Sequence, residues 1–297
     1  MNPVLRQLLS APLQIVAVWM VLVVAVPIAM SMYPSYVLRP GFECQRSSVA
    51  VVSGEALPAG GCRTLADLYG LPFVDLFVDS MFRSLALLVG AAVLALVVGT
   101  LLGVVAALWR RRAFASGGIV AGTTVVAAVP AFFVAYFLQI AVILLGASST
   151  GGRLLPIYGF GYDEHLVLPL LSISLPAIAY TAQLTATRMQ DVLDSDFITV
   201  ANAKGLRTSS IVAVHVLPHV RPVLLEGLSS GLRVSVASLP IIEFLFQWRG
   251  IGQLSLEAVG VHDAPGFVFS AIVMATFFVM LSVLADLSRP RVLFRAL

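Results

Sequence analysis

Few side chains in this sequence have the types and spacings needed for hydrolytic or metal chemistry. Of the four histidines, only His215 and His219 stand four residues apart, and no carboxylate or cysteine joins them. Pro218, between them, is expected to break the helix that would align the two rings. The chain has no C-x-x-C pair and no G-x-x-x-x-G-K-[ST] phosphate loop. We therefore expect no metal, no cofactor and no catalytic residue, so this chain is not an enzyme by itself.

Ionisable residues inside apolar segments are better candidates for function. Arg233 lies within a long apolar segment, among small polar residues that include Ser230 and Ser235. A charge near the bilayer centre is costly and usually faces the interior of a helix bundle. We predict that Arg233, Ser230 and Ser235 line a substrate pathway, as does Glu243 near the outer end of the segment. A structural ion pair between Arg233 and a neighbouring span is the alternative.

The composition indicates an integral membrane protein. Of the 297 residues, 59% are hydrophobic and 11% are charged, and the mean hydropathy is +0.99. A soluble domain has about 25% charged residues. The net charge of +3 comes from cations beside apolar segments rather than among aromatic residues. We therefore predict contact with membrane lipid and none with nucleic acid.

Apolar runs long enough to cross about 30 Å of hydrocarbon predict an all-α protein with six spans. They lie at residues 12–32, 84–108, 117–146, 165–186, 223–246 and 267–287. The first run is interpreted as a retained span, because it is too long for a signal peptide and no cleavage site follows. Pro130 could kink the third. Residues 1–11 are expected to form an interfacial elbow helix, and residues 71–80 an amphipathic interfacial helix that enters the second span.

The distribution of cations predicts the orientation of the chain in the membrane. If the N-terminus is inside, the inner segments hold most of the cations: Arg6, Arg110, Arg111, Arg112, Arg188, Lys204, Arg207, Arg221, Arg289, Arg291 and Arg295. The outer segments hold fewer cations and most of the carboxylates. Both termini, including the tail 288–297, are therefore predicted to be cytoplasmic, together with segment 187–222. Segments 33–80 and 247–266 are predicted to be extracytoplasmic.

Both cysteines of the chain, Cys44 and Cys62, lie in the polar, turn-rich segment 33–80. In an extracytoplasmic compartment, a disulfide between them would staple a small loop domain. Two unpaired thiols without function are the alternative.

The segment between the fourth and fifth runs is longer than a simple connector and carries helix signals. Ser195 or Asp196 is a candidate N-cap, and Lys204 and Gly205 are suited to close the first helix. A second short helix is expected to begin near Ser209 or Ser210 and to be stopped by Pro218. Two helices joined by a glycine turn suit a docking element. An amphipathic pair resting on lipid headgroups is the alternative.

This segment resembles the cytoplasmic EAA loop of permease subunits in binding-protein-dependent ABC importers. The positions that match the family pattern are Thr199, Val200, Ala201, Gly205, His215, Leu217 and Pro218, of which Ala201, Gly205, Leu217 and Pro218 hold the family residue. The dipeptide and oligopeptide branch is more similar still. Its matching residues are Val192, Leu193, Asp196, Phe197, Ile198, Thr199, Ala201, Ala203, Lys204, Gly205, Leu206 and His215.

A second match follows about fifty residues later. The oligopeptide branch has a motif here that this chain supplies with Glu243, Phe246, Gly250, Ile251, Gly252, Leu254, Ala258, Asp263 and Pro265. Gly250 and Gly252 permit a tight reversal at the membrane surface. The chain also departs from the family. Thr199 replaces the glutamate of the EAA pattern, Arg249 replaces the usual proline before Gly-x-Gly, and Pro218 and His219 stand where this branch usually has Arg-Asn. The P-G-D-P stretch that is common after the first span is missing.

The resemblance implies a permease subunit of a peptide importer in a bacterial inner membrane. Its implied partners are a second, similar permease, two ATPase subunits that hydrolyse ATP, and an extracytoplasmic peptide-binding protein. Asp196, Thr199, Ala201, Lys204, Gly205, His215, Leu217 and Pro218 would then couple the permease to the ATPase. Import of nickel, haem or glutathione by the same architecture is one alternative. An ion-coupled secondary transporter is another, but it predicts paired charges at mid-membrane and an internal repeat, which we do not see.

Overall fold

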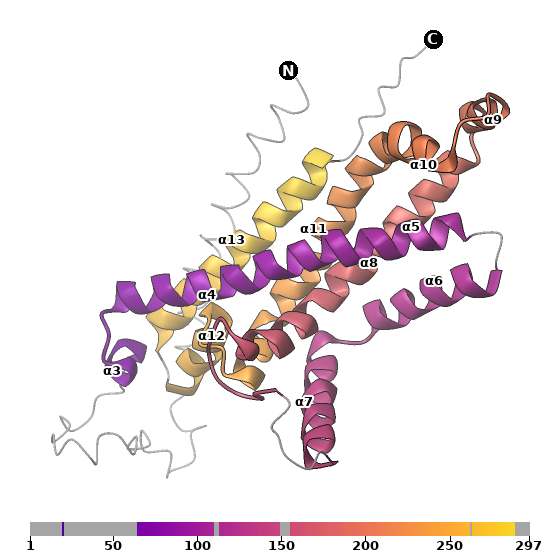
Figure 1. Cartoon of the computed structure of the whole chain (residues 1–297). Coiled ribbons are helices and arrows are strands. Elements are labelled where there is room, and N and C mark those ends of the chain that lie inside the picture. Colours follow the sequence, from indigo (N-terminus) through magenta and orange to yellow (C-terminus); the bar gives the residue numbers. More distant parts are fainter. Residues whose placement is uncertain (1–19, 21–63, 110–112, 149–154, 262, 289–297) are drawn as a thin grey trace, which may run out of the picture.

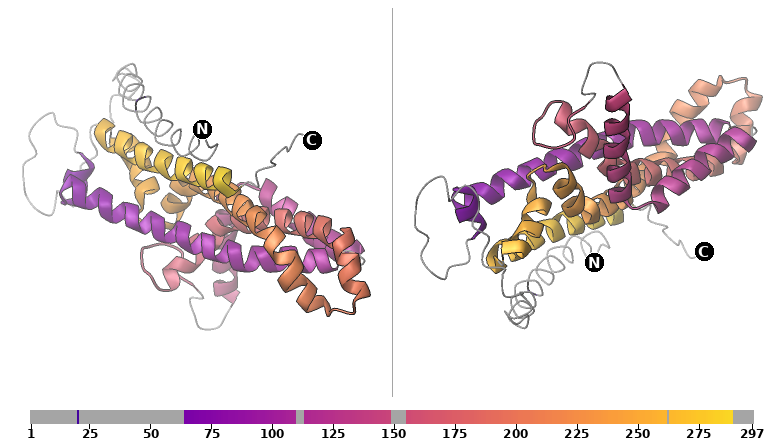
Figure 2. Two further views of the ribbon diagram at one scale, coloured as in Figure 1. Left: turned by 90° about the horizontal axis from the view of Figure 1, so that it is seen from above. Right: turned by 90° about the horizontal axis from the view of Figure 1, so that it is seen from below.

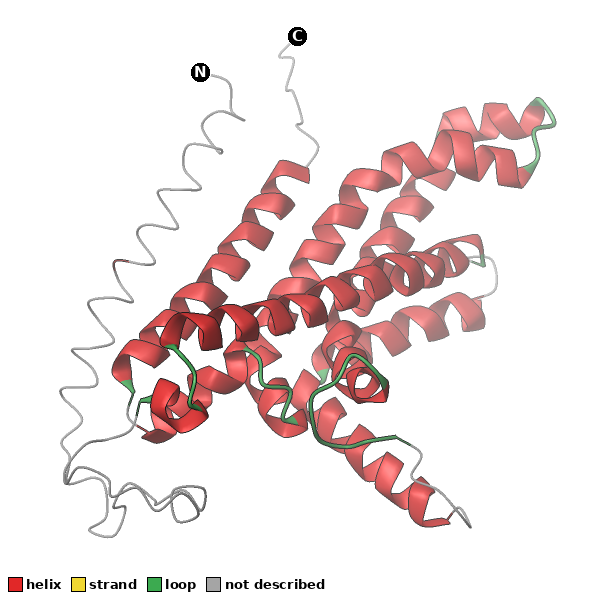
Figure 3. Cartoon of the chain, turned by 60° about the vertical axis from the view of Figure 1, so that its left-hand side comes forward, coloured by secondary structure: helices red, strands yellow, loops and turns green. Residues whose placement is uncertain are grey.

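The computed structural model describes residues 20, 64–109, 113–148, 155–261 and 263–288, and the regular elements in these ranges are all helices (Figure 3). They are α3 (Leu65–Tyr69), α4 (Phe73–Leu94), η1 (Ala95–Gly99), α5 (Thr100–Leu108), α6 (Ala113–Ala128), α7 (Ala131–Ser148), η2 (Glu164–Leu166), α8 (Val167–Leu193), α9 (Asp196–Ala203), α10 (Thr208–Ser210), η3 (Ile211–Val216), α11 (Leu217–Phe246), α12 (Ile251–Val261) and α13 (Ala264–Ser288). The all-α prediction is confirmed for these residues. The elbow 1–11, the first span apart from Met20, Cys44, Cys62 and the tail from residue 289 lie outside them.

Among the described residues, the helices long and apolar enough to cross a membrane are Phe73–Leu108, Glu164–Leu193, Thr208–Phe246 and Ala264–Asp286. A bent pair, Ser116–Ala128 and Ala131–Gly146, is the further candidate span. The prediction of six spans stays a prediction, because the first apolar run lies outside the described residues.

The helix expected at residues 71–80 is continuous with the helix of the predicted second span. The helix that begins at Phe73 continues through α4, the π-helical η1 and α5 to Leu108 without a break. No proline or glycine stands between Phe73 and Phe82, so nothing ends the helix at the expected boundary. The helix that contains the predicted second span, 84–108, therefore extends beyond it on the N-terminal side.

The predicted third span is divided into two helices at Pro130. Helices α6 and α7 end and begin on either side of Val129 and Pro130, and their axes meet at 101°. Proline lacks the N–H of the helical ladder and its ring clashes with the preceding turn, which is why a helix bends there. Helix α7 consequently points away from the long axis of the bundle (Figures 1 and 2). Its Gln139 side chain donates a hydrogen bond of 3.0 Å to the Leu245 carbonyl of α11.

Helix α8 lies at the centre of the bundle, and small residues bring helices close to it on both sides. A Cβ on Gly99 or Gly103 would lie 2.9 Å from the Cβ of Thr181 or 2.6 Å from that of Thr185, respectively. Gly227 and Gly231 of α11 face the α8 backbone: a Cβ on Gly231 would overlap Ala177 Cα, and one on Gly227 would lie 3.0 Å from Thr181 Cα. Small residues at four-residue spacing are a common device for close packing of membrane helices.

The two ends of the bundle carry the two motifs identified in the sequence. Helices α9 and α10 form one tip, while α3 and α12 lie at the opposite end (Figure 1). Helix α11 connects them, and its 30 residues span about 45 Å at 1.5 Å per residue.

Candidate functional site

The tip of the bundle is formed by α9 and the glycine turn that follows it. Ser195 occupies the N-cap position in an extended conformation, although its hydroxyl donates to the Val192 carbonyl rather than to an α9 amide. Gly205 has a φ of 75°. Its N–H donates to the Asn202 carbonyl at 2.9 Å, and the Leu206 N–H donates to the Ala201 carbonyl at 3.3 Å. This pair of bonds is the Schellman motif, which requires a left-handed residue and favours glycine.

The second arm of the tip differs from the prediction. Pro218 does not stop a short helix, because the π-helical η3 (Ile211–Val216) continues directly into α11. Proline has no backbone N–H to donate, and its ring clashes with the carbonyl four residues before it in a regular α-helix. The wider π turn ahead of Pro218 accommodates both the missing donor and the ring. The N-terminal part of α11 is therefore one arm of the tip. His219 lies on it, with its Nδ1 2.8 Å from the His215 carbonyl oxygen.

One face of α9 is buried and the other is exposed. Ile198 and Ala201 pack into an apolar cluster with Ile211, Val216 and Val220. The exposed apolar side chains at the tip are Phe197, Val200, Leu206 and Val214. We call these four residues the tip surface. Of the predicted coupling residues, Asp196, Thr199, Lys204, Gly205 and Pro218 are exposed, His215 and Leu217 are half-buried, and Ala201 is buried.

At the opposite end of the bundle, the environment of Glu243 differs from the predicted one. It is fully buried rather than lining an open pathway. Its carboxylate accepts hydrogen bonds from Ser84 Oγ at 2.6 Å and from the backbone N–H groups of Gly252 and Gln253 at 2.8 and 3.1 Å. Those amides belong to the first turn of α12, where a helix dipole favours negative charge. Glu243 therefore holds α4, α11 and α12 together.

Close contacts explain why glycine stands at Gly250 and Gly252 of the outer motif. A Cβ on Gly250 would overlap the Glu243 carboxylate, and a Cβ on Gly252 would lie 2.7 Å from Pro240 Cα. Asp263 makes a similar junction nearby. Its two carboxylate oxygens accept the N–H of Leu65 at 2.9 Å and that of Gly266 at 3.0 Å, which joins α3 to the start of α13.

The turn between α11 and α12 has an unusual backbone. Gln247 and Arg249 have φ angles of 54° and 56°, in the left-handed region. Trp248 between them is fully buried, and its indole N–H donates to the Arg83 carbonyl at 3.2 Å. Arg249 stands where the family pattern has proline, and proline, with its φ fixed near −65°, cannot adopt this conformation. The replacement of the family's proline by Arg249 therefore coincides with a backbone conformation that proline could not adopt.

Arg233 lies half-buried in α11, and its guanidinium donates to Ser230 Oγ at 3.0 Å and to Ser282 Oγ of α13 at 3.4 Å. Among the described residues its recorded partners are these hydroxyls, and no carboxylate pairs with it. Ser235 differs from the prediction: it is buried and donates to the Ile173 carbonyl of α8 at 2.7 Å. It packs two helices together, so pathway lining stays a prediction only for Arg233 and Ser230.

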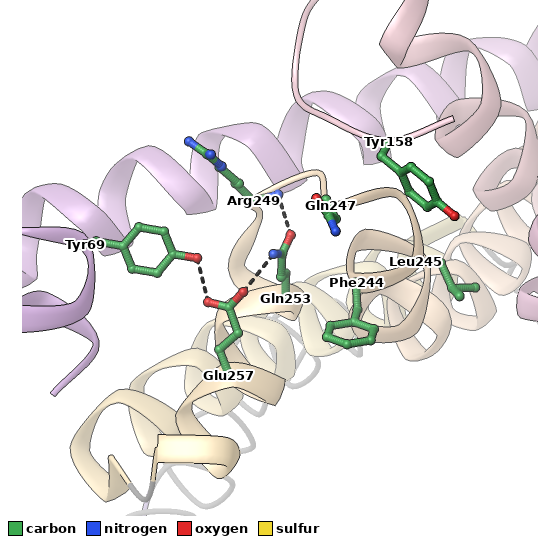
Figure 4. Close-up of a pocket in the computed structure, with 8 residues that line it drawn as sticks. All are labelled: Tyr69, Tyr158, Phe244, Leu245, Gln247, Arg249, Gln253 and Glu257. Carbon is green, nitrogen blue, oxygen red and sulfur yellow. Dashed lines mark hydrogen bonds between the residues drawn. The ribbon is translucent and has the colours of Figure 1, made fainter. Parts of the chain in front are cut away.

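Sequence reasoning missed a polar chain that connects α3 with α12. Tyr69 donates to Glu257 Oε2 at 2.6 Å, Gln253 Nε2 donates to Glu257 Oε1 at 2.8 Å, and the Arg249 N–H donates to Gln253 Oε1 at 2.7 Å (Figure 4). The four-residue spacing from Arg249 through Gln253 to Glu257 was visible in the sequence, but nothing in it pointed to Tyr69. The partner comes from a segment almost 190 residues away.

The Tyr69 hydroxyl should contribute a modest amount to the stability of this end of the bundle. Burial, followed by the hydrogen bond to Glu257, raises the pKa of Tyr69 above its ordinary value. The phenol therefore stays protonated through neutral and moderately alkaline pH, and the bond should persist there. Tyr69→Phe should lower the free energy of unfolding by about 1 kcal/mol, the usual contribution of one hydrogen bond. Thermal unfolding of the purified protein at neutral pH and near pH 10 measures this, and an unchanged midpoint would contradict it.

Taken together, a bundle of apolar helices with an exposed apolar tip at one end and a buried, hydrogen-bonded turn at the other defines a polytopic membrane protein. Residues 99–294 match the family described as "Binding-protein-dependent transport system inner membrane component". Because this match covers more than half of the chain, the chain belongs to that family. It is a multi-pass inner-membrane protein, as predicted from the sequence, and the predicted membership of this permease family is confirmed.

Individual relatives and one solved structure agree with this assignment. The chain is 27% identical over 227 residues to a probable peptide ABC transporter permease of Sinorhizobium fredii, covering 74% of this chain and 70% of that protein. It is 26% identical over 218 residues to the metal-staphylopine import system permease of Staphylococcus aureus, covering 73% and 68%. A dipeptide transport system permease of Alkalihalophilus pseudofirmus is 35% identical over 126 residues, covering 42% and 37%.

Among solved structures, a chain of the MetNI methionine ABC transporter, in a study of inward-facing conformations, has a TM-score of 0.58 at 14% identity. The match covers 74% of this chain and 99% of that one. At this identity the likeness concerns the fold alone.

Proposed function

We propose that this chain is the permease subunit of an ABC importer that carries peptides across the bacterial inner membrane. The cargo is supported by the names of relatives, which include a peptide permease and a dipeptide permease. Relatives named for metal-staphylopine and glutathione import make those cargoes the second candidates. All of these relatives are permeases, so the candidates differ in cargo and agree in architecture.

The proposed partners are a second, similar permease, two ATPase subunits and an extracytoplasmic binding protein. The ATPase subunits hydrolyse ATP, and this chain transmits their movement. The observation that carries this proposal is the tip surface. Phe197 and Val200 expose apolar area on the glycine-capped helix α9, Leu206 on the turn that follows it, and Val214 on η3. Burial of that area in a cleft of the ATPase would provide the affinity. Coupling requires that the two nucleotide states of the ATPase favour different openings of the pathway.

Val200→Asp should uncouple the complex, because it places a charge in the centre of the proposed contact. Val200 is an exposed residue of α9, so the fold should tolerate the change. The assay is ATP hydrolysis by the reconstituted complex with its binding protein, with and without dipeptides to tetrapeptides. We expect loss of peptide-stimulated hydrolysis and of ATPase association. Peptide-stimulated hydrolysis at the normal rate in Val200→Asp would refute the docking role.

Val259→Asp is the matched control for this experiment. Val259 is a similarly exposed valine, but it lies in α12, at the other end of the bundle. It should leave association with the ATPase unchanged. A wild-type complex that is stimulated by glutathione or by a metal complex, and not by peptides, would keep the architecture and replace the cargo.

A further inference from the structure

The end of the bundle opposite the tip contains a cavity of about 480 Å³. Its walls come from separate parts of the chain: α3, the loop before η2, the end of α11, the turn after it, and α12 (Figure 4). The lining residues are Tyr69, Tyr158, Phe244, Leu245, Gln247, Arg249, Gln253 and Glu257. This volume lies within the range of small-molecule binding pockets, which is about 300–1,000 Å³. By the predicted orientation, the cavity faces the extracytoplasmic side.

Two opposite charges line this cavity without neutralising each other. Within the described residues, no ion pair joins Arg249 to Glu257 or to another carboxylate. Arg249 is exposed, and its recorded hydrogen bond uses the backbone N–H, which leaves the guanidinium available. Glu257 accepts one bond from Tyr69 and one from Gln253, and a carboxylate has about four acceptor sites. Each charged group can therefore still bind a ligand.

The backbone holds the cavity residues in fixed positions. Gln247 and Arg249 both have backbone angles in the left-handed region, which is unfavourable for residues other than glycine. Such conformations persist where the surroundings determine them, and they concentrate at binding and catalytic sites. Here Trp248 is buried between the two residues and its backbone N–H donates to the Glu243 carbonyl at 2.9 Å. The turn thus presents Gln247 and Arg249 to the cavity on a rigid support.

The remaining walls suit an organic ligand rather than an ion. Phe244, Leu245 and Tyr158 provide apolar and aromatic surface, and the amides of Gln247 and Gln253 lie between them and the charged groups (Figure 4). A cation, an anion, amide groups and an apolar wall in one cavity are complementary to a molecule with a free carboxylate, a free ammonium and a side chain.

We propose that this cavity binds a zwitterionic ligand, a free amino acid or a short peptide, with its carboxylate on Arg249 and its ammonium on Glu257. The inference rests on the proposed peptide cargo and adds to it a binding site on the permease itself. The site would hold the ligand at the extracytoplasmic face, separate from any site on the binding protein.

Direct binding tests the site without transport. The probe is radiolabelled alanyl-phenylalanine, with its C-terminal amide and its N-acetyl derivative, bound to the complete permease–ATPase complex in lipid nanodiscs without binding protein. Arg249→Gln should weaken binding of the free dipeptide by about tenfold, the effect of a lost charged hydrogen bond, and leave the C-terminal amide unaffected. Glu257→Gln should weaken binding of the free dipeptide and leave the N-acetyl derivative unaffected. This exchange of selectivity is a readout that a purely structural role would not give.

Two controls accompany these variants. Arg249→Lys keeps the charge and should restore most of the affinity. Glu164→Gln removes an exposed carboxylate from the same end of the bundle, outside the cavity, and should change nothing.

The outcomes for the site and for the cargo are distinguishable. Absence of saturable binding at millimolar dipeptide, or an equal loss for all three probes in Arg249→Gln, would overturn the proposed site. Dipeptide binding with this selectivity in a complex that transports no peptide would keep the site and refute the proposed peptide cargo.

Discussion

Replacing Glu243 by alanine should lower the free energy of unfolding by about 3 kcal/mol or more. The side chain is fully buried and accepts hydrogen bonds from Ser84 and from the amides of Gly252 and Gln253. Without it, three donors are buried with no acceptor, and each costs about 1–3 kcal/mol. Glu243→Gln should be milder, because the amide oxygen can still accept from the two backbone groups. Thermal unfolding of the purified complex in detergent measures both variants.

Gly250→Ala provides an independent check on the same junction. Its Cβ would overlap the Glu243 carboxylate, so the carboxylate would have to leave the α12 amides. It should therefore reproduce part of the loss seen in Glu243→Ala, whereas Gly260→Ala, which has open space around it, should not. If Glu243→Ala and Gly250→Ala both unfold at the wild-type temperature, the buried carboxylate is not what fixes this end of the bundle.

Gly231→Ala should separate α8 from α11, although it adds a single methyl group. Its Cβ would overlap Ala177 Cα and lie 2.9 Å from the Ala177 nitrogen, so the obstacle is backbone that no side-chain rotation can relieve. Overpacking of this kind typically costs about 1–3 kcal/mol and more where backbone must move. A shift would also lengthen the bond from Ser235 to the Ile173 carbonyl. We expect a large fall in the yield of monodisperse protein and in its unfolding temperature.

A graded series of glycine variants separates this steric effect from helix propensity. At Gly227 the nearest backbone atom, Thr181 Cα, is 3.0 Å away, so Gly227→Ala should be intermediate. Gly122 in α6 has no neighbour within 4 Å, so Gly122→Ala should be neutral or slightly stabilising, as alanine favours helix. Equal behaviour of the three variants would show that the close approach of α8 and α11 is not needed for stability.

Hydropathy and charge in the sequence were sufficient to predict several features of this protein. They predicted an all-α membrane protein, and the apolar runs placed the long helices near their observed positions. This works because each helix that crosses lipid must by itself be apolar and long enough to span the hydrocarbon. The glycine turn after α9 was also predictable. Lys204 and Gly205 close a helix through local hydrogen bonds to Asn202 and Ala201, which lie within the same short segment.

Other features of the fold were not predicted correctly from the sequence. The break at Pro130 was foreseen only as a possible kink, since its 101° angle is a property of the folded chain. Pro218 was expected to stop a helix and does not, because the π-helical turn before it accommodates the ring. Ser235 and Glu243 were assigned to a pathway on their polarity alone. The structure buries both, because each has a partner on another helix.

Periodicity, hydropathy and local hydrogen bonding are encoded within short segments, so the class of the protein, the approximate helices and the capped turn could be predicted from the amino-acid sequence. The role of each polar residue could not, because it depends on the folded chain. A carboxylate in an apolar run reads the same whether it faces a pathway, caps a distant helix as Glu243 does, or lines a cavity as Glu257 does. The role of such a carboxylate depends on hydrogen-bond donors from segments far away in the chain. A single sequence does not show which distant segments are in contact.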